Sequence, residues 1–327
     1  MILSICLDTF LTLFYRNNST SCKGAFLFCD IIKHMINFEL FNKKNGLALS
    51  GGGIKSYVQQ PVIEFLYSKK IKFQYFAGTS MGSVIATLLS FGLTAEELKT
   101  SLIRLEKIFI DRKIMYPNMP ILNKNKLNGF IDGQRLEDVL SEEFSLHGYE
   151  NIEDIKTGLF IISVDILTSK LIIFTSCKSF KSKNPNAIVI YEGKLSQIVR
   201  ASCTIPVLFS SYDYEGMKLV DGGLLMNLPV SPLLDVGAKK VVSISMLSEQ
   251  SESNCESIID IGLRSLDMLI ESTVHLERSK STININIPLS NVTIIDVGKS
   301  NTVFTSAQQW IDGNKKALSQ QIKEKEL

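Results

Sequence analysis

The chain has 327 residues, 45% of them apolar, so it can bury a large core as one big α/β domain or two smaller ones. Its formal net charge of +2 carries no polyanion-binding signature, which argues against a nucleic-acid partner. Only three histidines are present, so a Ser-His-Asp triad has few candidates. The six cysteines form no C-x-x-C pair, which favours free thiols in a reducing compartment, although a disulfide among the first thirty residues stays open.

Residues 1–44 are interpreted as an N-terminal extension, and the domain is expected over 45–327. The apolar run 1–15 is too short to span a membrane and lacks the basic start of a signal peptide. Two explanations stay open for this extension. Either the extension results from an upstream start codon and translation of the native protein begins at Met35, or the extension is a functional anchor.

Strand and helix patterns alternate along the rest of the chain, which predicts a largely parallel sheet sandwiched by helices. Strands or extended segments are expected at 47–49, 71–77, 159–166, 170–175, 207–209, 212–220 (a hairpin turning at Glu215-Gly216), 241–246, 282–287 and 292–297. Helices are expected at 57–70, 81–91, from Thr94 onward, at 131–144, 194–201, 256–280 and 306–324. Within 57–70, Pro61 either kinks the helix or starts a fresh turn.

The segment 99–126 mixes lysines and arginines with apolar residues and prolines. This composition suits a mobile cover that touches an anionic interface. An ordinary solvated helix followed by a loop is the alternative.

The stretch 78–82 reads Gly-Thr-Ser-Met-Gly, between an apolar strand and an apolar helix. This G-x-S-x-G pattern is typical of a sharp turn that presents a serine hydroxyl, here Ser80, to a ligand. The flanking Gly78 and Gly82 allow close packing around the strained serine. A glycine-flanked turn with a capping serine is the alternative.

Three consecutive glycines, Gly51, Gly52 and Gly53, lie between a strand and a helix. Their N–H groups can converge on a negative oxygen, so we expect an oxyanion hole. A dinucleotide-binding loop fits poorly, because Ser56 replaces the third glycine of that motif. A plain tight turn is the remaining alternative.

A base for Ser80 is sought among few candidates. His147 lies at an expected helix end and His275 inside a long helix, and neither position is typical of a catalytic histidine. Asp221 ends an apolar strand and is followed by Gly222 and Gly223. Burial would raise its pKa toward a useful range, so a Ser-Asp dyad is predicted. A hairpin-type Asp-Gly turn is the alternative.

Four motifs, taken in chain order, resemble those of the patatin-like phospholipase family: G-G-G-I-K-S, G-T-S-M-G, the block at 201–209 and D-G-G. The region 129–140 resembles that family as well. The resemblance implies a three-layer α/β/α sandwich with a mostly parallel central sheet. It also implies Ser80 as nucleophile, Asp221 as base and an oxyanion hole at Gly51, Gly52 and Gly53, to which Met81 is added. Lys55, Gly78, Gly82, Gly222 and Gly223 would support these motifs.

Two residues depart from the family pattern. Ser56 stands where a glycine normally closes the first motif, and Pro61 stands where a small residue is usual. An uncompensated proline would cost up to about 3 kcal/mol in a helix interior. Both changes could shift the oxyanion loop.

The sequence therefore predicts a serine lipid acyl hydrolase of phospholipase A or lysophospholipase type, which requires no metal or cofactor. Its expected partners are a phospholipid or lysophospholipid and a membrane surface. The expected location is cytoplasmic or peripheral at a membrane, and secretion as an effector stays open. The alternatives are a Ser-His-Asp carboxylesterase, an acyltransferase, and a lipid-binding protein with weakened activity.

Overall fold

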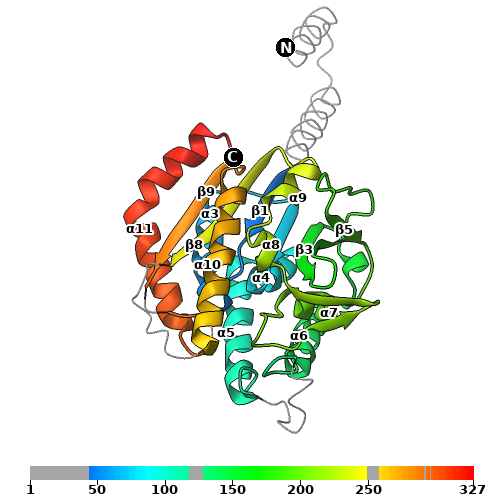
Figure 1. Cartoon of the computed structure of the whole chain (residues 1–327). Coiled ribbons are helices and arrows are strands. Elements are labelled where there is room, and N and C mark those ends of the chain that lie inside the picture. Colours follow the sequence, from blue (N-terminus) through cyan, green and yellow to red (C-terminus); the bar gives the residue numbers. More distant parts are fainter. Residues whose placement is uncertain (1–43, 118–127, 249–257, 291, 295) are drawn as a thin grey trace, which may run out of the picture. The chain divides into compact units, whose positions relative to one another are not determined.

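The computed structural model describes residues 44–117, 128–248, 258–290, 292–294 and 296–327. Residues 44–327 form one unit around a mixed sheet whose strands lie in the order β5-β4-β3-β2-β1-β8-β9 (Figure 1). The strands are β1 (Asn45–Leu49), β2 (Tyr75–Thr79), β3 (Gly158–Asp165), β4 (Lys170–Thr175), β5 (Ala187–Ile190), β6 (Tyr212–Tyr214), β7 (Met217–Asp221), β8 (Lys240–Ser248) and β9 (Ile283–Leu289). Pairing is parallel along β3-β2-β1-β8-β9 and antiparallel where β3 meets β4 and β7.

Both faces of the sheet are covered, because alternate side chains of its central strands enter two separate cores. Leu47 and Leu49 of β1 join the larger core, whereas Ala48 between them joins the smaller one. The helices are α3 (Gln59–Ser68), α4 (Met81–Ser90), α5 (Ala95–Asp111), α6 (Gln134–Leu146), α7 (Leu195–Ser202), α8 (Gly223–Met226), α9 (Val230–Asp235), α10 (Ile258–Arg278) and α11 (Ser300–Glu324). The larger core lies beneath α3, α4, α5 and α11, and α8, α9 and α10 cover the other face. The predicted three-layer α/β/α fold is confirmed.

Local signals explain most element boundaries. Thr94 caps α5 through a reciprocal capping box with Glu97, as a Thr-x-x-Glu sequence predicts. The hairpin β6-β7 turns at Glu215 and Gly216, both with positive φ, as predicted. The predicted helix over 57–70 divides into a 3₁₀ turn, Gly53–Val58, and α3. Pro61 is the third residue of α3 and lies in its first turn, where proline is tolerated better than in a helix interior.

Three expectations about local structure are wrong or incomplete. Residues 206–208 form a turn with Val207 at φ 73° and not a strand, although Phe209 forms an isolated bridge with Ile131. The described residues of 292–297 are not a strand. Helix α11 begins at Ser300, six residues before the expected start, because Glu106 of α5 accepts hydrogen bonds from the Ser300 N–H and hydroxyl. Much of the expected cover, 118–127, lies outside the described residues.

Candidate active site

The pairing of β3 brings Ser80 and Asp221 together. Strand β2 occupies one edge of β3 as far as the pair Thr79–Ile162, and β7 continues on that edge from the pair Asp221–Ser163. The two strands are antiparallel to each other, so their carboxyl ends meet head to head. The residue after Thr79 is Ser80, whose side chain lies beside the Asp221 carboxyl in the lining of one cavity and lowers the pKa of that carboxyl. The predicted nucleophile and its predicted base are therefore in contact.

The turn at Ser80 is strained and tightly packed. Ser80 has φ 53° and ψ −131°, a conformation that L-residues rarely adopt outside nucleophile turns. A Cβ on Gly78 would lie 2.2 Å from the Gly82 carbonyl oxygen, so this position accepts only glycine. The Ser202 hydroxyl accepts a hydrogen bond from the Ser80 N–H (2.9 Å) and donates one to the Ile162 carbonyl (2.6 Å). Ser202, whose role the sequence did not indicate, thus fixes the turn to β3.

Asp221 is 3% exposed, and its environment suits a general base. Burial raises the pKa of its carboxyl to about 6, although hydrogen bonds from the Ser80 hydroxyl and the Gly223 N–H work against that rise. The Gly223 N–H lies 2.8 Å from Asp221 Oδ1. Gly222 and Gly223 lead into α8 and not into a hairpin, so the alternative of a hairpin Asp-Gly turn is wrong.

The glycine loop faces Ser80, but its first N–H group is already used. The Gly51 N–H donates to the backbone carbonyl of Asn227 (3.2 Å) and to its Oδ1 (3.1 Å). Gly51 is therefore a structural member of the loop and not a free oxyanion donor, which corrects the prediction for this residue. Among the described residues, the N–H groups of Gly52, Gly53 and Met81 have no acceptor. These three remain as candidate donors.

Gly53 requires glycine for two reasons. Its φ is 55°, and an added Cβ would lie 1.9 Å from the backbone oxygen of Ile294. Ser56, by contrast, fits where the family pattern has glycine, because its buried hydroxyl donates to the Ser50 carbonyl (3.3 Å). The Lys55 side chain is buried and lines the same cavity as Ser80.

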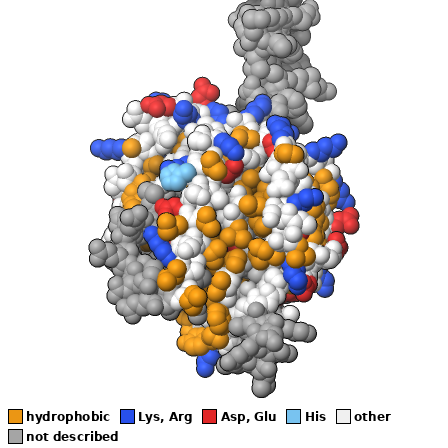
Figure 2. Space-filling model, in the orientation of Figure 1, with side chains coloured by type: hydrophobic (Ala, Val, Ile, Leu, Met, Phe, Trp, Pro, Cys, Tyr) orange, Lys and Arg blue, Asp and Glu red, His pale blue; other side chains and the backbone are white. Residues whose placement is uncertain are grey.

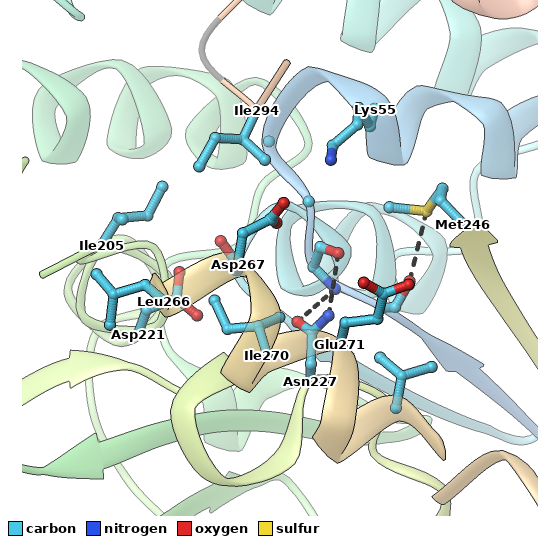
Figure 3. Close-up of a pocket in the computed structure, with 16 residues that line it drawn as sticks. Lys55, Ile205, Asp221, Asn227, Met246, Leu266, Asp267, Ile270, Glu271 and Ile294 are labelled. Atoms are coloured by element: carbon cyan, nitrogen blue, oxygen red, sulfur yellow. Dashed lines mark hydrogen bonds between the residues drawn. The ribbon is translucent and has the colours of Figure 1, made fainter. Parts of the chain in front are cut away.

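Asn227 holds the glycine loop in place, and sequence reasoning missed it. Besides accepting from Gly51, its amide Nδ2 donates to the Gly51 carbonyl (3.3 Å) (Figure 3). Its own N–H donates to Thr273 Oγ1 of α10 (3.1 Å). The signal available in the sequence was a polar residue six positions after Asp221, directly after the apolar stretch that forms α8, and this signal is weak by itself.

Replacing Asn227 with alanine removes both side-chain hydrogen bonds to the loop. We expect the free energy of unfolding to fall by about 1–3 kcal/mol, since the buried Gly51 carbonyl loses its partner. We expect kcat to fall roughly 10-fold to 100-fold with a smaller change in KM, because the oxyanion donors move. Steady-state kinetics and urea denaturation measure the two effects. Thr100→Ala, on the exposed side of α5, is the control, and an unchanged kcat for Asn227→Ala would contradict this role.

Two cavities meet at Ser80, and Gly53, Ile205 and Ile294 also border both. One of them contains the dyad, and we call it the polar cavity because charged and amide side chains gather in it beside several aliphatic ones (Figure 3). The charged and amide side chains around the dyad are Lys55, Asn227, Asp267 and Glu271. The apolar cavity is lined mainly by Ile54, Tyr57, Val84, Phe109, Leu136 and Phe209.

One carboxylate, Glu106, borders the apolar cavity, and its charge is already engaged. It is 7% exposed and accepts hydrogen bonds from the Gly298 N–H (2.8 Å) and the Ser300 N–H (3.0 Å), at the N-terminus of α11. A carboxylate at this end of a helix is stabilised by the helix dipole. The cavity therefore keeps an apolar lining suited to a hydrocarbon chain.

The other candidate bases lie outside the cavities that contain Ser80, and the other candidate nucleophile is protonated. His147 packs against Phe91 and contacts Glu143, and exposed His275 contacts Arg278. Neither lines a cavity that contains Ser80. The thiol of Cys203 borders the apolar cavity, but burial raises its pKa well above the usual range. It stays protonated and is not a competing nucleophile.

Comparison with known proteins identifies the chain's relatives. The sequence profile of the patatin-like phospholipases matches residues 47–234. Protein YqhO of Bacillus subtilis is 24% identical over 212 residues, which cover 62% of this chain and 71% of that protein. Lysophospholipase NTE1 of Meyerozyma guilliermondii is 25% identical over 236 residues, which cover 70% of this chain and 15% of that protein. The crystal structure of VipD from Legionella pneumophila aligns over 83% of this chain and 67% of that one, with TM-score 0.46 and 14% identity.

The profile match includes both Ser80 and Asp221 and extends over more than half of the chain. It confirms the resemblance that the ordered glycine, serine and aspartate motifs predicted. The chain belongs to the patatin-like phospholipase family and is a lipid ester hydrolase.

Proposed function

We propose that the protein is a serine acyl hydrolase of phospholipase A or lysophospholipase type, peripheral at a membrane surface, with Ser80 and Asp221 as its catalytic dyad. One observation carries the proposal. Strands β2 and β7 end head to head on one edge of β3, and this sets the Ser80 hydroxyl on a buried carboxylate whose pKa is raised to about 6. The Meyerozyma relative is named a lysophospholipase, which agrees with this substrate class.

In the first half-reaction, Ser80 Oγ attacks the carbonyl carbon of the lipid ester while Asp221 takes the hydroxyl proton. The negative oxygen of the tetrahedral intermediate is stabilised by the N–H groups of Gly52, Gly53 and Met81. The intermediate collapses with cleavage of the ester C–O bond. The proton on Asp221 passes to the leaving alkoxide, and the acyl group stays on Ser80.

In the second half-reaction, Asp221 removes a proton from a water molecule that attacks the acyl-enzyme carbonyl. The bond from the carbonyl carbon to Ser80 Oγ then breaks, and the proton returns from Asp221 to that oxygen. A free fatty acid is released. The apolar cavity would hold the acyl chain through both steps, and the polar cavity would hold the alcohol side of the ester.

A lipid panel tests this function. We expect release of free fatty acid from phosphatidylcholine or lysophosphatidylcholine, measured by mass spectrometry, and labelling of the purified protein by a fluorophosphonate probe. Glycerol or a second lysophospholipid added as acceptor should not divert the acyl group from water. Acyl transfer in place of hydrolysis would favour the acyltransferase alternative, and absence of both labelling and fatty-acid release would overturn the proposal.

A further inference from the structure

Helix α10 has two apolar faces, although a surface helix normally has one. Its inner face contributes Leu266, Ile270 and Val274 to the polar cavity. Five further aliphatic side chains of the helix are more than half exposed, namely Ile258, Ile261, Met268, Leu269 and Leu276. We call these five the outer face. Hydrophobic side chains gather over α10 on the surface shown in Figure 2.

The outer face is continuous and uncharged. At 3.6 residues per turn its five positions fall within an arc of about 100°. The exposed residues interspersed in this arc are Ser265 and Ser272, and the charged residues Arg264, Asp267 and Glu271 lie on one flank. The face extends over about 27 Å from Ile258 to Leu276, at 1.5 Å per residue. An apolar strip bordered by a charged flank is typical of a helix that lies in the plane of a lipid surface.

The composition of the outer face favours lipid over a protein partner. Protein interfaces are enriched in tyrosine, tryptophan and arginine anchors, and this strip has none. The same helix walls the cavity that contains Ser80, so whatever the outer face contacts lies about one helix diameter, roughly 10 Å, from that cavity. For a lipid ester hydrolase, a surface of aggregated lipid is the occupant that this position favours. No described helix is long and apolar enough to cross a bilayer.

We propose that the outer face of α10 docks the enzyme on the lipid–water interface, with the helix axis in the plane of that interface. The inference extends the proposed function by naming the surface through which the site reaches aggregated substrate. Docking here would place the lipid head groups about one helix diameter, roughly 10 Å, from the polar cavity. It would also bury aliphatic side chains that are otherwise hydrated.

Vesicle binding tests the docking surface separately from catalysis. The full chain carrying Ser80→Ala, with or without the double change Met268→Asp and Leu269→Asp, is sedimented with phosphatidylcholine vesicles. We expect the double change to lower the bound fraction at least about tenfold, because two charges would enter the apolar interface. The matched control is Ile166→Asp with Leu167→Asp, two exposed aliphatic residues at the β3–β4 turn, which should leave binding unchanged. Leu276→Glu, at the other end of the helix, should weaken binding in the same direction.

Activity measurements with intact Ser80 complete the test. The Met268→Asp and Leu269→Asp enzyme should hydrolyse vesicle phospholipid about tenfold more slowly, yet hydrolyse soluble p-nitrophenyl butyrate within about twofold of the unmodified enzyme. Unchanged vesicle binding by this variant, or no vesicle binding by the parent chain, would overturn the docking surface. Sedimentation velocity gives a further outcome that would overturn the docking surface. If the parent chain is a dimer and the Met268→Asp and Leu269→Asp variant is a monomer, a second copy of the chain occupies this face. The binding measurement needs no hydrolysis, so failure of the proposed function would leave its result readable.

Discussion

Replacing Ser80 with alanine is expected to lower kcat/KM for lipid esters by about 10⁴-fold or more and to abolish labelling by a fluorophosphonate probe. The reason is that the covalent route needs the Ser80 oxygen, and the neighbouring Cys203 thiol is protonated and cannot replace it. Fatty-acid release and gel fluorescence of the labelled protein measure the two effects. The variant should fold, because the Ser80 backbone N–H keeps its hydrogen bond to Ser202.

A second serine, at the far end of the helix that follows Ser80, provides the control for labelling. Ser90 is buried near the other end of α4, where its hydroxyl donates to the Thr87 carbonyl (2.6 Å). Ser90→Ala should keep both labelling and activity. Persistent labelling of Ser80→Ala would show that another residue is the nucleophile, and the assignment of Ser80 would then be wrong.

Replacing Asp221 with asparagine is expected to lower kcat/KM by about 10²-fold to 10⁴-fold, since the amide accepts no proton from Ser80. In the unmodified enzyme, activity should rise with pH and level off above an apparent pKa near 6, because burial raises the pKa of this carboxyl to about 6. The asparagine variant should lose that limb of the pH profile. Full hydrolysis by Asp221→Asn would refute the dyad.

The same substitution should stabilise the protein at neutral pH. The pKa of this carboxyl is 3.8 in the unfolded chain and about 6 in the folded protein. The free energy of unfolding therefore falls as pH rises from about 4 to about 6, by roughly 3 kcal/mol once the carboxyl is ionised in both states. Asp221→Asn removes this cost, so its stabilisation should be largest above about pH 7 and vanish below about pH 4. Urea denaturation across this pH range measures the change.

Two controls belong with the Asp221 experiment. Asp213→Asn alters an exposed carboxylate in the same hairpin, paired with Lys218, and should change neither activity nor the pH profile. His275→Ala should also retain activity, since His275 is exposed and contacts Arg278. Loss of activity in His275→Ala would instead support the Ser-His-Asp alternative.

The local features of the site were readable in the sequence because each depends on residues close together in the chain. The Ser80 turn needs an apolar strand, two glycines and a helix start, all between 71 and 91, and the structure has β2, the turn and α4 in that order. The hairpin and the start of α5 were predictable for the same reason. Glu215 and Gly216 accept positive φ, and Thr94 and Glu97 cap each other.

Predictions failed where a distant residue decides the local structure. Helix α11 starts early because Glu106, almost two hundred residues away, accepts from its first N–H groups. The segment 292–297 has the apolar composition of a strand, but Ile294 contacts the glycine loop and the described residues of the segment extend no sheet edge. Gly51 was assigned as an oxyanion donor because its competing acceptor, Asn227, is 176 residues further along the chain.

By itself, the sequence determined that the chain carries a serine turn, a glycine loop and a strand-end aspartate, because backbone conformation at those points follows from glycine placement and local apolar patterning. Only the tertiary structure decided that Ser80 and Asp221 touch, since β2 and β7 pair with neighbouring residues of β3 and not with each other. The structure also decided which glycine N–H groups stay free and which face of α10 stays exposed. These properties depend on partners distant in the chain, whose positions are set by sheet register and core packing.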